Sequence, residues 1–463
     1  MSMSKAELES KHLAELHELA IEAGVPRYRL LRYDELIEEL LVRSADAAPS
    51  ESESETEEGR EERRPRRRRR RGRQPTEEPD ADRGRQATVE EEGEDAEPEP
   101  EPDKDREPAA ERAGEETEPV SGVLDVLPQG HGFVRLEGLD PREGDVYVSA
   151  SQIRRCELRP GDEVSGPARP PRRGERHPAL VRVDAVNGAE PVDERTGSFE
   201  DLTPIRPGRR LLLDPEPGDV LVRAAELLAP LAYGQRVLIR AAPHSGRTTL
   251  LRGLVRAIAA APGDQRIVVL LVDERPEEVT EWRRQAPGVE IVAAPADLDA
   301  SDQVRHAELA LSRAKRRVEA GEDVVFLIDS LSRLGVATGD PAAVKRFFGV
   351  GRELEEEGAG SLTVIATVLT GTSDGDGVME AVKTTENATL AIDPSLAAAG
   401  IVPAIDASQS SAAGESGLLE DSELAATRRL SAELRALDPA EAAGLLRERI
   451  EASASNAELL ASL

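Results

Sequence analysis

The spacing of apolar positions divides the chain into parts with different expected structures. Over residues 121–185, short alternating apolar runs are separated by Gly and Pro turns, a pattern typical of closely spaced strands. We expect strands at 122–127, 129–135, 145–148, 162–166 and 179–183. Five short strands in so few residues predict a small OB-type barrel.

Residues 200–420 follow a different pattern, in which wholly apolar strands alternate with amphipathic helices. The expected strands are 237–241, 267–272, 290–293, 324–329, 361–368 and 389–392, and the expected helices include 248–260, 276–284 and 301–319. Such alternation predicts a mostly parallel sheet in an α/β domain. Residues 421–463 read as helices again, and Asp438-Pro439 is expected to open one of them.

The first 120 residues carry little apolar patterning outside residues 4–43, which are expected to form a helical hairpin broken at 24–26. Residues 45–120 are rich in Glu, Pro, Arg and Ser, so they bury too little apolar surface to fold and are predicted to be disordered. Their Arg-rich block, residues 63–73, either contacts phosphate backbones or is neutralised by the flanking Glu runs. The predicted domains are 1–44, 45–120, 121–186, 187–420 and 421–463.

Composition narrows the class of protein. The formal net charge of the 463 residues is −31, with much of the charge in residues 45–120. A single cysteine, Cys156, excludes an intrachain disulfide and indicates a structural thiol in a reducing compartment. The chain has no apolar run of membrane-spanning length and no signal peptide, so a cytoplasmic protein without a membrane segment is expected. Its six histidines lack metal-ligand spacing, so no zinc site is expected.

Three segments carry nucleotide chemistry. Residues 241–248 form a candidate phosphate loop between a strand and a helix. The apolar run 268–272 leads into Asp273 and Glu274, and a carboxylate in that place can polarise an attacking water. A second apolar strand ends in Asp329, the position of a carboxylate that holds Mg²⁺ on the phosphates. Together they predict a RecA-type domain that uses ATP and Mg²⁺.

The predicted barrel carries candidate nucleic-acid chemistry. Phe133 and Tyr147 lie on neighbouring expected strands. Several arginines lie nearby in the sequence, namely Arg154, Arg155, Arg169, Arg172, Arg173 and Arg176. Exposed rings beside guanidinium groups form a platform for single strands, because bases stack on the rings and phosphates meet the charges. The two aromatics could instead belong to the barrel core; aromatic residues make up only 2% of the chain, which favours the binding interpretation.

These motifs, in this order, resemble those of the Rho family of transcription termination factors, hexameric RNA-dependent ATPases of bacteria. The resemblance rests on residues 130–135, 145–149, 151–155, 174–176 and 199–204 in the barrel part, and on 233–236, 273–280, 329–333, 345–349 and 402–406 in the α/β part. It covers nearly everything outside residues 45–120. It implies single-stranded RNA, the RNA polymerase elongation complex and a homohexameric ring as partners.

The resemblance also implies site residues. The RNA site would comprise Gly130, His131, Gly132, Phe133, Val134, Arg135, Asp145, Val146, Tyr147, Glu175, Arg176 and His177. The nucleotide site would comprise Ala232, Tyr233, Gly234, Gln235, Arg236, Val237, Pro243, His244, Ser245, Gly246, Arg247, Thr248, Thr249 and Arg275. Glu274, Asp329 and Arg247 would be catalytic, with Thr248 and Asp329 as the metal ligands.

The chain departs from the family pattern at several functional positions. Arg247 stands in place of the phosphate-loop lysine, and residues 407–414 and 394–400 lack the arginine finger and the basic stretch before it. The two expected channel loops are a short segment, 334–340, and an acidic one, 371–377. His131 and His177 replace aromatic residues, although an imidazole can also stack on a base.

Two functions remain open on these residues. The chain is either an active Rho-type motor that releases transcripts, or a related RNA-binding regulatory protein that hydrolyses ATP slowly and joins rings of a standard Rho. A missing finger costs about 10³–10⁵ in rate, so hydrolysis by the purified protein would separate the two. A further, weaker hypothesis makes residues 45–120 the main RNA-binding element.

Overall fold

The computed structural model describes residues 117–191, 197–216 and 218–463. The predicted helical hairpin at 4–43 and the Arg-rich block at 63–73 lie outside the described residues, as does almost all of the segment 45–120. No helix among the described residues is both long and apolar enough to cross a membrane.

The barrel is built as the sequence predicts. Its elements are β1 (Glu118–Val126), β2 (Gly132–Arg135), β3 (Val146–Val148), α4 (Ala150–Arg155), β4 (Glu163–Arg169), β5 (Ala179–Leu180) and β6 (Ala185–Val186). The strand order is β1-β2-β3-β5-β4-β6, and β1 also pairs with β4, which closes the barrel. The predicted OB-type fold is confirmed. One boundary was wrong, because Glu118–Val120 already pair with β4 although we expected disorder up to residue 120.

Alternation along the strands separates the inside of the barrel from its outside. Leu124, Val134, Val146 and Val148 are at most 1% exposed and form its core together with the buried Cys156. Phe133 and Tyr147, which lie between these positions in β2 and β3, stay outside that core. A side-chain period of two therefore sends the valines inward and the rings outward.

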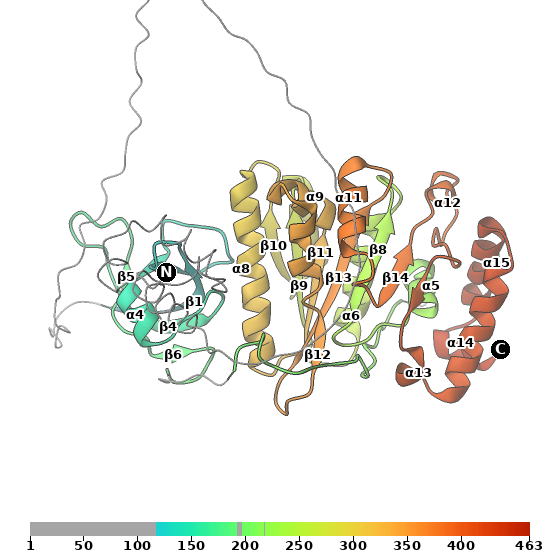
Figure 1. Cartoon of the computed structure of the whole chain (residues 1–463), viewed down its shortest axis with the longest axis horizontal. Helices are drawn as coiled ribbons and strands as arrows, with labels where there is room; N and C mark the ends of the chain where they lie inside the picture. The colour runs from blue at the N-terminus through green and yellow to red at the C-terminus, as the bar shows by residue number, and fades with distance from the viewer. Residues whose placement is uncertain (1–116, 192–196, 217) are drawn as a thin grey trace, which may run out of the picture. The chain divides into compact units, whose positions relative to one another are not determined.

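The α/β part is a mostly parallel sheet (Figure 1). The order is β10 (Glu290–Ala294), β9 (Arg266–Val272), β11 (Val324–Asp329), β13 (Ser361–Leu369), β8 (Arg236–Ala241), β14 (Ala388–Ala391) and β15 (Ser411–Ala412). All neighbours from β10 to β14 in this order pair in parallel, whereas β15 pairs antiparallel with β14. Two short strands, β7 (Pro204–Ile205) and β12 (Arg352–Leu354), join beside β13.

Helices connect and cover these strands. They are α5 (Val220–Leu228), α6 (Arg247–Ala260), α7 (Pro276–Gln285), α8 (Ala300–Glu319), α9 (Leu331–Thr338), η2 (Pro341–Val344), α10 (Lys345–Phe348), α11 (Ser373–Val382), α12 (Pro394–Ala398), α13 (Glu415–Leu418), α14 (Asp421–Arg435), α15 (Pro439–Glu451) and α16 (Asn456–Ala461). The strands and helices predicted between residues 237 and 392 recur within a residue of their expected bounds, whereas several barrel strands begin or end three or four residues from theirs. Asp438 caps α15 with Pro439 in its first turn, as predicted.

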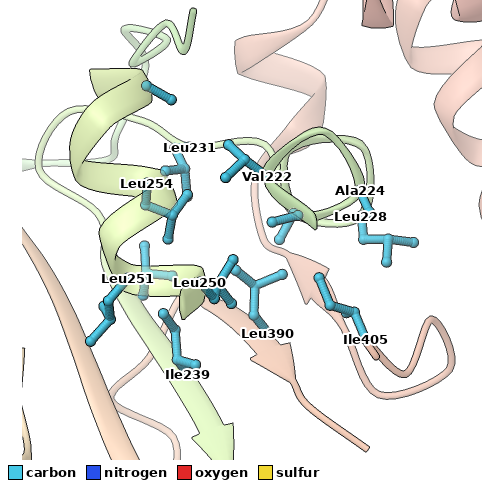
Figure 2. Close-up of a cluster of buried hydrophobic side chains, with 14 of the residues drawn as sticks. Val222, Ala224, Leu228, Leu231, Ile239, Leu250, Leu251, Leu254, Leu390 and Ile405 are labelled. Atoms are coloured by element: carbon cyan, nitrogen blue, oxygen red, sulfur yellow. The ribbon is translucent and has the colours of Figure 1, made fainter. Parts of the chain in front are cut away.

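Two apolar cores flank the sheet, because successive strand residues face opposite sides. Leu238 belongs to one core and its neighbour Ile239 to the other. Figure 2 shows Ile239 among side chains of the two helices α5 and α6, with Leu390 and Ile405 beside them. These cores fix the strand ends, and with them the loops that follow.

Both segments expected as channel loops are largely helical, which corrects that prediction. Ser330 accepts a hydrogen bond from the backbone of Arg333 and so caps α9, which continues to Thr338. Thr372 caps α11 in the same way, and Asp374 and Asp376 lie in its first turn. Acidic residues there are favourable because the N-terminus of a helix carries partial positive charge.

Candidate functional site

The phosphate loop is a tight turn between β8 and α6. His244 and Gly246 have positive φ values of 59° and 94°, and Gly246 is the N-cap of α6. The Ser245 hydroxyl donates to the Ala242 carbonyl at 2.7 Å, which closes the turn. The N-terminus of this 14-residue helix leaves backbone N–H groups without helical partners, and such a terminus is a favourable site for phosphate.

Two carboxylates lie at the neighbouring strand ends. Asp329 ends β11 and is 1% exposed, and Glu274 follows β9 and is 8% exposed. One carboxylate oxygen of Asp329, Oδ1, accepts a hydrogen bond from Thr367 at 3.0 Å. The other oxygen, Oδ2, is buried and has no hydrogen-bond partner among the described residues. The parallel sheet therefore brings Glu274 and Asp329 to one edge, as the sequence predicts.

Arg247 joins these two carboxylates from the first turn of α6. Its Nη2 lies 2.9 Å from Asp329 Oδ1 and 3.4 Å from Glu274 Oε1, and its side chain is 10% exposed. Its Nε is buried without a hydrogen-bond acceptor among the described residues. The predicted catalytic trio is thus assembled, but with the guanidinium directed at both acids.

Arg333 is a site residue that the sequence motifs did not assign. Its Nη1 lies 2.5 Å from Glu274 Oε1, and it comes from the first turn of α9, directly after Asp329. Its Nε also lies 4.0 Å from the exposed Asp273, so two arginines face three carboxylates, of which Glu274 and Asp329 are buried. A basic residue four positions after the strand-end aspartate was the available signal, since one helical turn returns it to the same edge.

Burial has the largest effect on the pKa of Glu274. Desolvation raises its pKa above 4.5, and the nearby Asp329 charge acts in the same direction. Arg333 and Arg247 lower the pKa, but burial outweighs them. A carboxyl group of this kind is suited to exchange a proton with water more readily than an exposed glutamate.

The oxygen donors present fit a magnesium ion in part. Asp329 Oδ2 is an unsatisfied buried acceptor, and Thr248 supplies a hydroxyl from the first turn of α6. Oxygen ligands of this type are those that Mg²⁺ prefers. Asp329 Oδ1, however, already has the Arg247 guanidinium as its counter-ion.

The segment Ala232–Val237 lies away from the phosphate loop of its own chain. It precedes and begins β8, whereas the loop follows the other end of this strand, about 20 Å away at ~3.3 Å per residue. Ala232, Gln235 and Val237 are at most 1% exposed, and the Gln235 side chain accepts from the Ala232 backbone. Within one copy of the chain this segment does not join the phosphate loop, and its assignment to a nucleotide site stays a prediction. Arg275, also assigned there, is exposed at the start of α7.

Residues 407–414 close on themselves instead of presenting a cation. The Asp406 carboxylate accepts hydrogen bonds from the backbone and hydroxyl of Ser408 at 2.8 and 2.6 Å. It also accepts from the Gln409 amide at 2.6 Å. The turn that precedes β15 therefore carries uncharged polar side chains, which cannot supply the positive charge of an arginine finger.

Four rings gather on the outside of the barrel. The Phe133 ring centroid lies 6.1 Å from His131, 5.9 Å from Tyr147 and 4.9 Å from His177, and His131 lies 5.6 Å from Tyr147. Tyr147 is 37% exposed, and none of the four belongs to the barrel core. The alternative that Phe133 and Tyr147 are core residues is therefore wrong. We call these four residues the aromatic face.

Several predicted RNA-site residues support the aromatic face from below. Arg135 is 5% exposed and pairs with Asp125 at 2.5 Å and with Asp145 at 2.6 Å, while its guanidinium lies 5.5 Å from the Phe133 ring centroid. Val134 and Val146 are core residues. The expectation that these side chains meet RNA directly is corrected, because they are buried.

The remaining predicted residues lie around the aromatic face. A Cβ at Gly132 would come within 2.6 Å of a backbone oxygen of Asp125, so only glycine fits there. Glu175 pairs with Arg169 at 2.6 Å, and this partner lowers its pKa from 4.5 to about 2. Arg176 is exposed on the same loop, and Gly130 turns the chain between β1 and β2 with a φ of 86°.

Three family models match stretches of the chain. Residues 7–48 match the Rho termination factor N-terminal domain, 120–192 match the Rho termination factor RNA-binding domain, and 222–347 match the nucleotide-binding domain of the ATP synthase alpha/beta family. A solved ATPase of a bacterial type III secretion system is similar with a TM-score of 0.47 and 21% identity, over 61% of this chain and 93% of that one.

The similar curated proteins are transcription termination factors Rho. The chain is 42% identical to that of Streptomyces lividans over 74% of this chain and 51% of the relative. It is 38% identical to that of Mycobacterium leprae over 82% and 64%. It thus spans about half to two thirds of these two relatives. With that of Aquifex aeolicus it shares 39% identity over 74% of this chain and 84% of the relative. The chain therefore belongs to the Rho family of transcription termination factors.

Proposed function

We propose that this protein acts in transcription termination by binding nascent single-stranded RNA on its barrel and using ATP in its RecA-like domain. The observation that carries the proposal is the aromatic face, whose four rings lie outside a fully formed barrel core, with Tyr147 exposed and the other three half-buried. The named relatives support it. The ring of six copies, the RNA polymerase elongation complex and the cytoplasmic location belong to the same proposal.

RNA recognition starts from stacking. Bases stack on the rings of the aromatic face, and guanidinium groups such as that of Arg176, one residue before His177, meet the phosphates. Stacking is available to every base, whereas phosphate contacts release counter-ions. Binding is therefore expected to discriminate weakly between sequences and to weaken as salt increases.

The nucleotide site holds its ligand by the loop and the helix terminus. Phosphate oxygens accept hydrogen bonds from the N–H groups at the start of α6. A magnesium ion would neutralise charge on the phosphates, with Asp329 and Thr248 as the residues that would hold it once Arg247 has moved away from Asp329. Glu274 would orient and polarise the attacking water, and Arg333 holds that carboxylate in place.

A second candidate function is an RNA-binding regulatory protein without efficient hydrolysis. It is favoured by the pairing of Arg247 with both carboxylates and by the closed turn at residues 407–414. Both candidates bind RNA and nucleotide, and they differ only in turnover.

ATP hydrolysis by the purified full chain, with and without cytidine-rich RNA, separates the two candidates. RNA-stimulated turnover supports the motor. RNA binding without turnover, in both the native chain and Arg247→Lys, supports the regulatory protein. Failure to bind single-stranded RNA at all would refute both.

A further inference from the structure

The Arg247 guanidinium lies beside Asp329, the carboxylate that would otherwise bind a divalent cation. Asp329 is 1% exposed, and a buried carboxylate requires a counter-charge. In this chain the counter-charge is a guanidinium 2.9 Å from Oδ1, which cannot lose its proton. A metal ion that ligates Oδ1 must displace Arg247.

Arg247 would also oppose a metal ion bound to the other oxygen of Asp329, Oδ2. A dication bound to Oδ2 would lie within a few ångströms of the Arg247 guanidinium. Like charges repel strongly in a site this buried, because solvent screens them little. Arg333 adds a second positive charge on the adjoining Glu274. Arg333 also lies 4.0 Å from Asp273, the exposed acid next to Glu274. The two buried acids, Glu274 and Asp329, are therefore paired with two guanidinium groups, which already supply positive charge where a dication would bind.

Arg247 also retains a donor for an anion. Its Nε is buried without an acceptor among the described residues, and the residue is the first of α6, at the phosphate loop. Arginine can use its other N–H groups at the same time, because the guanidinium presents five donors in a rigid fork. One side chain can thus hold Asp329 through Nη2 while other N–H groups of the guanidinium remain without a partner in the described part of the chain, for a phosphate oxygen to use.

We propose that Arg247 is the internal counter-ion of Asp329, so that the phosphate loop binds nucleoside diphosphates and triphosphates nearly independently of divalent cations. The inference rests on nucleotide binding, which both candidate functions share. A lysine at this position has a single ammonium group, which cannot hold Asp329 and a phosphate with separate nitrogens. Arg247→Lys should therefore release Asp329 to a metal ion.

The test is titration of the full chain with ADP that carries a fluorescent N-methylanthraniloyl group, in buffer with Mg²⁺ and in buffer with EDTA. For the native chain, the two dissociation constants should differ by less than about threefold. For Arg247→Lys, Mg²⁺ should tighten binding at least about tenfold, which corresponds to ~1.4 kcal/mol. The matched control is Arg256→Lys on the same helix, whose side chain is 52% exposed and 3.7 Å from Asp219; it should behave as the native chain.

Two outcomes would overturn the inference, and only the second would also refute the proposed nucleotide binding. If Mg²⁺ tightens binding tenfold or more in the native chain, Arg247 is not the counter-ion, while nucleotide binding itself stands. If the native chain and both variants bind no nucleotide in either buffer, the proposed nucleotide use falls as well. Circular dichroism confirms that each variant is folded, and binding of Mn²⁺ to the ADP-loaded protein, followed by electron paramagnetic resonance, gives a second readout. Native protein should bind less Mn²⁺ than Arg247→Lys.

Discussion

The aromatic face and the nucleotide site use charge in opposite ways. On the barrel, Arg135 is neutralised by Asp125 and Asp145 beneath the rings, and the rings themselves remain outside the core. In the RecA-like domain, Arg247 neutralises the functional carboxylates directly. On the barrel, the buried ion pairs support the fold, and the rings form a separate binding surface. In the nucleotide site, the ion pairs are formed by the functional side chains themselves.

This difference teaches which substitutions a site tolerates. A stacking surface needs flat rings, so histidines at 131 and 177 still contribute to it. A catalytic site depends on where each charge lies, so arginine in place of lysine redirects the charge although it preserves it. Binding can therefore persist in the barrel while the chemistry of the other domain changes.

The largest expected effect is on the support beneath the aromatic face. Arg135→Leu leaves the buried Asp145 without a charged partner, whereas Asp125 keeps its pair with Arg305; this should destabilise the barrel by about 3–5 kcal/mol. Hydrogen exchange of the β2 and β3 amides in the full chain measures this. Arg142→Leu, whose side chain is 53% exposed on the same barrel, should change stability by no more than about 0.5 kcal/mol. Equal effects of the two substitutions would refute a supporting role.

The next effect concerns the face itself. Phe133→Ala removes the central ring and should weaken RNA binding by about 1–3 kcal/mol, or roughly 5- to 150-fold. The slope of affinity against salt should stay unchanged because the ring carries no charge. Fluorescence anisotropy with a cytidine-rich oligonucleotide measures both quantities. Leu136→Ala, at an exposed residue just after β2, serves as the control, and an unchanged affinity for Phe133→Ala would exclude the aromatic face.

A smaller effect should appear in the nucleotide site as pH changes. Because burial raises the pKa of Glu274 above 4.5, the folded state holds its proton more tightly than the unfolded state. The resulting stabilisation is complete below pH 4.5 and is lost as pH rises through the folded pKa. Glu274→Gln should flatten this dependence. Unfolding by urea, followed by the fluorescence of the single tryptophan, Trp282, reports on this domain.

The control for that experiment is Glu278→Gln, at a partly exposed residue on α7. It should leave the pH dependence as in the native chain. A steeper dependence in Glu274→Gln than in the native protein would contradict a raised pKa of Glu274.

The smallest effect is expected at the rim of the aromatic face. Arg169 lowers the pKa of Glu175 to about 2, so this pair stabilises the barrel above pH 4.5 and loses its effect as pH falls towards 2. The Glu175 side chain is 40% exposed, and solvent screening limits the contribution to about 1 kcal/mol or less. Glu175→Gln should reduce the loss of stability on acidification, as measured by hydrogen exchange of β4. Glu137→Gln, whose side chain is 74% exposed, should not.

The sequence predicts the frame of the molecule well, for physical reasons. Strands that are apolar up to their last residue, such as Val324–Asp329, are stable only inside a parallel sheet that is covered on both faces. The ends of two such strands place Glu274 and Asp329 at one edge of the sheet. The alternation in β2 and β3 likewise fixes the rings on the outer side.

Other features depend on contacts that no local pattern reveals. The glycines and small residues of 334–340 and 371–377 suggest loops, yet caps at Ser330 and Thr372 start helices there. Arg135 reads as a surface cation until two aspartates distant in sequence bury it. The sequence likewise does not show which way the Arg247 side chain points, because an arginine there can reach either a phosphate or a carboxylate.

The most direct test of this division between the two sites is RNA affinity of the full chain after substitution in each region. We predict that Phe133→Ala weakens binding at least about fivefold, whereas Arg247→Lys changes it less than about twofold. That result would establish an RNA-binding face that works without the charges of the nucleotide site. A larger loss from Arg247→Lys than from Phe133→Ala would contradict the division.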